Sequence, residues 1–256
     1  MAYFHREPIA VRLGKLADSG RSGVLRVSGD CGGVIYLSEG EVLYAESQRT
    51  PALAAWPVIP PDSTGRGASW AEPGAPGSLE WEYSVREATM DAALELIAGS
   101  GRNPPKHRFR ESGTLRIEGT NGIPVPALLA EVERRRRVLE QLSALLTPDT
   151  VVVRNPRFDP PALQVSAAQW TLLRHMGDRA TPRELALELG CSVFGTTIEV
   201  FRLVVLRLLA VAGVPAPPVP FIPPEHHGRP ILLVALVHDG DPAEGERAVA
   251  PIRALA

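Results

Sequence analysis

The strongest constraint on the fold lies in residues 20–47, GRSGVLRVSGDCGGVIYLSEGEVLYAES. Three runs of β-branched or aromatic residues, at 24–27, 34–37 and 42–45, are separated by turn-forming residues. This pattern predicts three short antiparallel strands in a meander. Because glycine takes a positive φ without a Cβ penalty, we expect Gly23, Gly33 and Gly40 to start or reverse strands rather than to bind phosphate.

The composition indicates a chain with one large or two small cores and no strong charge. The 256 residues are 45% hydrophobic, and the formal net charge is -2. A nearly neutral chain has no overall field that would draw it to nucleic acid or to an anionic membrane. Cys31 and Cys191 have neither CxxC nor metal-ligand spacing, so they are expected to be ordinary reduced thiols.

Targeting and membrane signals are not evident in the sequence. Residues 1–8 lack the order of a signal peptide. The longest apolar run, 200–215, is interrupted by Arg202 and Arg207 and is shorter than the roughly 20 residues of a spanning helix. We therefore expect a cytoplasmic protein that does not enter a membrane.

The remainder of the first half is predicted to mix helices, strands and one long loop. Apolar spacing predicts helices at 9–17 and 86–98. Alternation of apolar and charged residues predicts strands at 79–83 and 114–118. Six prolines among small polar residues predict a long loop over 48–77, with at most a helical turn near 53–56.

Residues 106–110, KHRFR, are basic with one aromatic residue. Such a segment is compatible with nucleic-acid binding, but it also describes an edge strand with Phe109 inward and its charges outward. We favour the edge strand.

Residues 124–146 give the strongest helical pattern and contain Arg134, Arg135, Arg136 and Arg137. Successive helical residues point about 100° apart, so one arginine must lie near the apolar stripe while the others are exposed. Glu131, Glu133 and Glu140 stand at helical pairing distance from the run. A salt-bridged face is therefore favoured over a phosphate-binding patch.

The second unit is predicted to contain a short strand at 151–153 and then three helices. Capping-box pairs mark the first two helices, Ser166 with Gln169 and Thr181 with Glu184. The first helix is expected to bury Trp170, Leu172, Leu173 and Met176. Ser192 is expected to cap a third helix over 193–212.

The outline of residues 166–213 is that of a helix-turn-helix. A recognition helix needs Arg, Lys, Asn or Gln near its N-terminus, whereas this one offers Val193, Phe194, Gly195, Thr196 and Thr197. Two arginines on the helix are few for phosphate contacts. We therefore expect a winged-helix-like unit used for packing or protein contacts.

The end of the chain has a different character. Residues 215–224 are rich in proline and are predicted to be extended. An apolar strand at 231–237 and an amphipathic helix at 244–255 follow. The segment 238–241, HDGD, could bind a metal, but a turn after a strand explains it more simply.

The N-terminal segments LGKLADSGRSGVLRV and YLSEGEVLYAES are similar to the PATAN domain, a module of bacterial signalling proteins. The residues that match the family pattern are Ser19, Arg21, Gly23, Leu25, Val27, Gly33, Ile35, Tyr36, Gly40 and Ala45. The resemblance extends to about the end of the arginine-rich helix, and the loop over 48–77 departs from the compact helices usual in the family. The resemblance implies regulatory interaction, often with response-regulator or small-GTPase circuitry, and no catalysis.

The tail GRPILLVALVHDGDPAEGERAVAPIRALA separately resembles a fragment of the substrate domain of berberine-bridge-type FAD-linked oxidases. The FAD-anchoring residues of that family are absent, so the resemblance implies neither cofactor nor activity. The motifs GxxxxGK[ST], HExxH and GxSxG do not occur in the sequence either.

The sequence thus predicts an α+β protein with three parts: a PATAN-like module at 1–147, a winged-helix-like unit at 148–214 and a linker with a strand-helix tail at 215–256. We expect a non-enzymatic signalling adaptor without cofactor or metal. A DNA-binding regulator using 166–213 is the alternative. The expected partner-binding residues are Arg21, Tyr36, Tyr44, Arg134, Arg135, Arg136 and Arg137.

Overall fold

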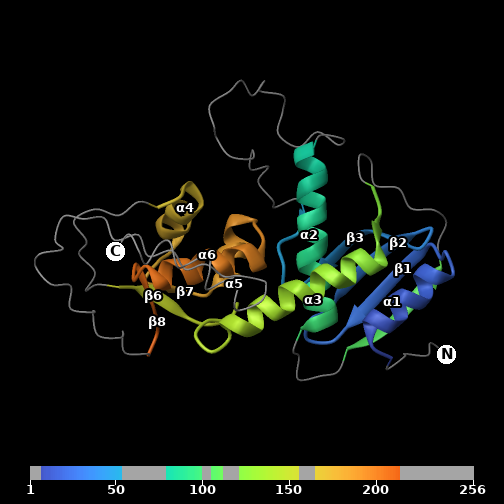
Figure 1. Cartoon of the computed structure of the whole chain (residues 1–256), viewed down its shortest axis with the longest axis horizontal. Helices are drawn as coiled ribbons and strands as arrows, with labels where there is room; N and C mark the ends of the chain where they lie inside the picture. Colours follow the sequence, from blue (N-terminus) through green and yellow to red (C-terminus); the bar gives the residue numbers. More distant parts are fainter. Residues whose placement is uncertain (1–6, 54–78, 100–104, 112–120, 156–164, 214–256) are drawn as a thin grey trace, which may run out of the picture. The chain divides into compact units, whose positions relative to one another are not determined.

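The computed structural model describes residues 7–53, 79–99, 105–111, 121–155 and 165–213 (Figure 1). The chain divides into two units, Met1–Val214 and Pro215–Ala256, and all described residues belong to the first. The predicted strand at 114–118 and the predicted elements of the tail lie outside the described residues, as does residue 54 onward of the predicted loop.

Residues 20–47 form the predicted meander. The strands are β1 (Gly23–Ser28), β2 (Gly33–Ser38) and β3 (Glu41–Ser47), and neighbours pair antiparallel. Glu39 and Gly40 form the two-residue turn between β2 and β3, with φ of 52° and 83°. A turn with positive φ at both central residues matches the twist of the strands that it joins.

Two further strands extend the meander on either side. β4 (Lys106–Glu111) pairs with β1, and β5 (Ile123–Pro124) pairs with the start of β3, which gives the order β4-β1-β2-β3-β5. The edge strand predicted at 106–110 is confirmed, and Phe109 packs against the core. β4 pairs along the whole of β1, whereas β5 pairs only with Glu41 and Val42 of β3.

Three helices complete this part, which we call the sheet module. They are α1 (Ile9–Asp18), α2 (Leu79–Ala98) and α3 (Val125–Leu142). Their apolar residues form one cluster with Leu25, Ile35 and Leu37 of the sheet. The strand predicted at 79–83 is wrong, because α2 begins at Leu79. Trp81 and Val85 stand one helical turn apart and pack with Tyr44. This packing requires the spacing of a helix and not the two-residue alternation of a strand.

The remaining elements form a second part, which we call the helical unit. Its helices are α4 (Ala167–His175), α5 (Pro182–Leu189) and α6 (Val193–Val205). Its strands are β6 (Val152–Arg154), β7 (Arg179–Ala180) and β8 (Leu209–Val211), which pair antiparallel in the order β7-β6-β8. Both predicted capping boxes are present. The α+β fold class is confirmed, and the division at residue 147 stays a prediction.

Two predictions in the helical unit are wrong. The third helix ends at Val205 and not at residue 212, because Arg207 takes a left-handed conformation with φ of 62° and Leu209–Val211 pairs with β6. Trp170, predicted to be buried, is 57% exposed. The buried side of α4 is formed instead by Gln169 and Leu172, with Met176 beyond its end.

Gly40 gives a direct test of this fold. A Cβ at this position would lie 2.6 Å from the carbonyl oxygen of Ala17, and the positive φ is unfavourable for any other residue. We expect Gly40→Ala to lower the free energy of unfolding by about 2 kcal/mol or more, measured by urea denaturation.

Gly14→Ala is the matched control. Gly14 lies within α1, and nothing stands within 4 Å of the Cβ that alanine would add. Alanine there should be neutral or stabilise the protein by up to about 1 kcal/mol. Equal effects of the two substitutions would contradict the turn described here.

Candidate interaction site

One row of α2 carries both apolar and acidic residues at steps of four. Leu79, Tyr83, Glu87, Asp91 and Glu95 follow one another along this row. Residues four apart lie on the same side of a helix. The row begins with exposed Leu79 and reaches Asp91, whose side chain is 1% exposed. It therefore leads from solvent into a buried, acidic contact region.

Arg135 of α3 supplies the cation in this region. Its guanidinium donates hydrogen bonds to Glu87 at 2.9 Å, to Asp91 at 3.0 Å and to Glu131 at 2.7 Å. Its side chain is only 5% exposed. The burial is tolerable because each of the three guanidinium nitrogens donates a hydrogen bond to a carboxylate.

Arg135 also ties the sheet module to the helical unit. Its guanidinium carbon lies 4.9 Å from the centre of the Phe194 ring, a distance typical of a cation–π contact. Phe194 belongs to the first turn of α6, yet it packs against the core of the sheet module. The arginine and the ring therefore join α3 to α6.

Asp91 binds the N-terminus of α6. Its carboxylate accepts a hydrogen bond from the Ser192 hydroxyl at 2.9 Å and another from the Val193 backbone N–H. Ser192 also caps the helix by accepting from the Gly195 N–H at 2.9 Å. A carboxylate at a helix N-terminus satisfies unpaired N–H groups and the helix dipole.

The burial of Asp91 has an electrostatic cost. Desolvation raises the pKa of Asp91 to about 6, while Arg135, Ser192 and Val193 act in the opposite direction. Glu131, by contrast, has its pKa lowered to about 2, chiefly by the hydrogen bond from Arg134. The two pKa values shift in opposite directions because Asp91 is buried whereas Glu131 is well paired near solvent.

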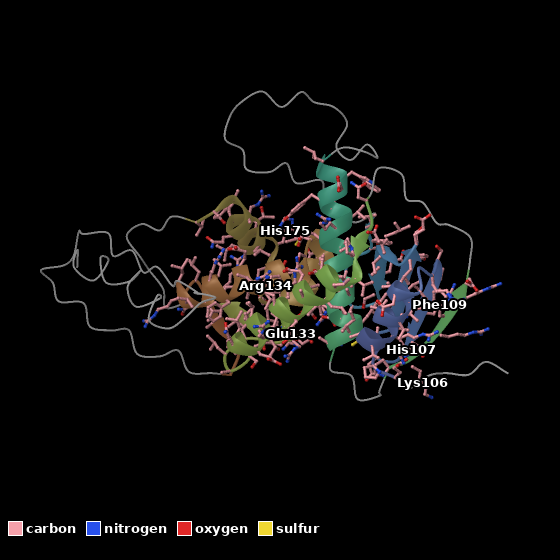
Figure 2. The ribbon with its side chains drawn as sticks, turned by 45° about the vertical axis from the view of Figure 1, so that its right-hand side comes forward. Lys106, His107, Phe109, Glu133, Arg134 and His175 are labelled. Atoms are coloured by element: carbon pink, nitrogen blue, oxygen red, sulfur yellow. The ribbon has the colours of Figure 1, made fainter. Side chains whose placement is uncertain are left out.

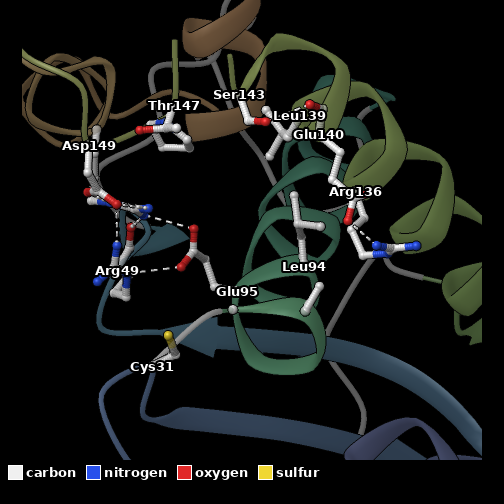
Figure 3. Close-up of a pocket in the computed structure, with 14 residues that line it drawn as sticks. Cys31, Arg49, Leu94, Glu95, Arg136, Leu139, Glu140, Ser143, Thr147 and Asp149 are labelled. Atoms are coloured by element: carbon white, nitrogen blue, oxygen red, sulfur yellow. Dashed lines mark hydrogen bonds and ion pairs between the residues drawn. The ribbon is translucent and has the colours of Figure 1, made fainter. Parts of the chain in front are cut away.

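A second ion cluster lies one turn further along α2. Glu95 accepts hydrogen bonds from Arg49 at 3.0 Å and from Arg183 at 2.9 Å. Asp149 pairs with both arginines at 2.7 Å. Arg183 stands in the first turn of α5, so this cluster is a further link between the sheet module and the helical unit. Figure 3 shows Arg49, Glu95 and Asp149 of this cluster.

The second ion cluster borders a cavity of about 540 Å³. Cys31 and Arg136 also line the cavity (Figure 3). Burial raises the pKa of the Cys31 thiol, and burial likewise raises that of Cys191. Both cysteines therefore favour the unreactive thiol form over the thiolate.

The arginine run of α3 forms salt bridges with neighbouring glutamates, as the sequence spacing predicted. Arg134 pairs with Glu131 at 2.7 Å, and Arg136 pairs with Glu133 at 2.8 Å. Figure 2 labels Arg134 and Glu133 on α3. Arg137 lies 3.4 Å from Glu133. Arg135 is the member that lies at the apolar stripe, so one arginine is buried and its neighbours face outward in salt bridges.

Of the other predicted partner-binding residues, Tyr36 and Tyr44 lie in the sheet and Arg21 precedes β1. Arg21 is exposed and pairs with Glu111 of β4 at 2.9 Å. The rings of Tyr36 and Tyr44 stack with centroids 6.2 Å apart. Tyr44 is buried, and its hydroxyl accepts a hydrogen bond from the Leu53 N–H at 3.3 Å. Burial raises the pKa of Tyr44 to about 12, as expected for a core residue rather than a surface contact.

Sequence reasoning identified Glu131 but missed the other acidic members of both clusters. Glu87, Asp91 and Glu95 stand at steps of four in a helix that is otherwise rich in apolar residues. That spacing was a usable signal for a charged contact face. No sequence pattern close to Glu95, however, identifies Arg49 and Arg183 as its partners, because they lie 46 and 88 positions away.

Comparisons of the chain with protein-family models, with curated proteins and with solved structures gave no match. In the part of the chain that the structure describes, no helix is both long and apolar enough to cross a membrane.

Asp91→Ala tests the link between the sheet module and the helical unit. The change leaves the Val193 N–H without its acceptor and removes a carboxylate from buried Arg135. We expect a loss of about 3 kcal/mol in the free energy of unfolding, measured by urea denaturation. Asp91→Asn should cost less, because its side-chain oxygen still accepts a hydrogen bond.

Asp178→Ala removes an exposed carboxylate and serves as the control. It should change the free energy of unfolding by no more than about 0.5 kcal/mol. An Asp91→Ala protein as stable as this control would contradict the buried contact with α6.

The pKa of Glu131 gives a prediction for acid. Its folded pKa of about 2 lies below the ordinary 4.5, so the unfolded state takes up the proton first as the pH falls. Stability from this group is therefore complete above pH 4.5 and is lost between there and about pH 2. Glu131→Gln should flatten the decline in melting temperature over this range.

Glu188→Gln, at an exposed position on α5, controls for the change in net charge. A Glu131→Gln protein that declines as steeply as wild type would show that its ion pairs do not stabilise the folded state.

Proposed function

We propose that this protein is a non-enzymatic regulatory adaptor that acts through protein–protein contacts. The contact of Asp91 with the first turn of α6 carries the proposal. It joins the sheet module to the helical unit through a buried, directional interaction. A partner that binds one arrangement of this contact more tightly than another favours that arrangement. Binding to the sheet module can then affect the helical unit, and the reverse.

The same contact disfavours the alternative, a DNA-binding regulator that uses residues 166–213. A helix-turn-helix protein inserts the N-terminal part of its second helix into the major groove. Here that part of α6 is occupied by Asp91, and Phe194 lies against Arg135. Insertion into DNA would require this contact to open and would bring phosphates toward acidic α2.

Affinity capture with the tagged full-length chain tests the proposal. We expect wild type and Asp178→Ala to enrich the same protein partner from a lysate of the host, quantified by mass spectrometry. Asp91→Ala should recover about tenfold less, a change equivalent to 1.4 kcal/mol in binding. Circular dichroism establishes that each variant is folded, and Asp91→Asn replaces the alanine variant if it is not.

Two results would overturn the proposal. Sub-micromolar binding to mixed-sequence duplex DNA that weakens steeply with salt would favour the transcriptional regulator. Capture of no protein partner, together with turnover of a small molecule, would contradict an adaptor.

A further inference from the structure

A second cavity lies between α2 and the helical unit and has a volume of about 720 Å³. We call it the α2–α4 groove. Tyr83 and Glu87 line it from α2, Ala167 and Ala168 from α4, and Gly195 and Glu199 from α6. Small side chains on two of these helices allow another backbone to approach closely.

Exposed apolar residues lead into the α2–α4 groove along α2. Tyr83 lines the groove and is 64% exposed, and Leu79, one turn earlier, is 82% exposed. Large apolar side chains side by side on a surface helix are typical of a protein contact rather than of a solvated face. An incoming apolar side chain would cover Tyr83.

The charge of the α2–α4 groove selects among partners. Glu87 and Glu199 line it, whereas no Lys, Arg or His does so among the residues that the structure describes. Their side chains are 22% and 21% exposed. Glu87 pairs with Arg135, whereas Glu199 pairs with Arg202 and also accepts a hydrogen bond from Gln169 at 2.9 Å. A carboxylate has about four lone-pair sites, so each can accept a further donor from a ligand.

We propose that the α2–α4 groove binds a basic amphipathic helix of a partner protein. Apolar side chains of that helix pack on Leu79 and Tyr83, and its Lys or Arg residues pair with Glu87 and Glu199. Helix-in-groove recognition of this kind uses apolar residues at helical spacing. The assignment deepens the proposed adaptor function, on which it rests, by stating the chemistry of the partner.

Fluorescence anisotropy with the full-length chain tests this assignment. The probes are two labelled peptides of about four helical turns with the same leucine positions, one with lysine and the other with glutamate at the remaining positions. We expect the lysine peptide to bind at least about tenfold more tightly, with an affinity that falls as salt rises.

Substitutions locate the binding site. Tyr83→Ala should weaken the lysine peptide about fivefold or more, since an aromatic contact is lost. Glu199→Gln should weaken it less and reduce its salt dependence. Val11→Ala removes apolar surface from α1, and Glu188→Gln removes an exposed carboxylate from α5, so both should bind as wild type.

Several outcomes would overturn the assignment. They are equal or tighter binding of the glutamate peptide, binding of neither peptide, and equal losses in the groove variants and their controls. If the peptides fail while capture of a protein partner still depends on Asp91, the adaptor function stands and this groove is not its binding site.

Discussion

The arrangement of this protein depends on the burial of Arg135. A guanidinium that is 5% exposed must keep its charge paired, because an unpaired buried ion costs several kcal/mol. Its carboxylate partners come from α2 and α3, and Phe194 of α6 covers it. The positions of α2, α3 and α6 therefore depend on one another, because moving any one of these helices would expose a buried charge or leave it unpaired.

The helix α2 extends this constraint along the boundary between the sheet module and the helical unit. Its row of residues at steps of four passes from Tyr83 in the groove, through Asp91 at α6, to Glu95 at the second ion cluster. Apolar burial holds the other side of α2 to the sheet. α2 thus lines the groove and contributes Asp91 and Glu95 to two of the links between the two parts, while Arg135 of α3 contacts Phe194 of α6.

Local chemistry determined what could be predicted from the sequence. The Glu39-Gly40 turn and the Thr181–Glu184 capping box depend on residues within a few positions, and both were found. The start of α2 and the end of α6 were missed because packing and strand pairing decide them. For the site, helical geometry predicted one buried arginine. Its partner Asp91 lies 44 positions away, and Ser192 lies 101 positions beyond Asp91, so no local pattern could pair them.

A buried ion network is a poor source of net stability but a good source of specificity, because its donors and acceptors fit one arrangement. Glu87 belongs to this network and also lines the α2–α4 groove. In the proposed complex, a cation of the partner that pairs with Glu87 would share that carboxylate with Arg135. Arg135 also pairs with Asp91, the residue that holds the N-terminus of α6. If a partner binds the α2–α4 groove as proposed, Arg135 would connect that binding to the attachment of α6, because it pairs with both Glu87 and Asp91.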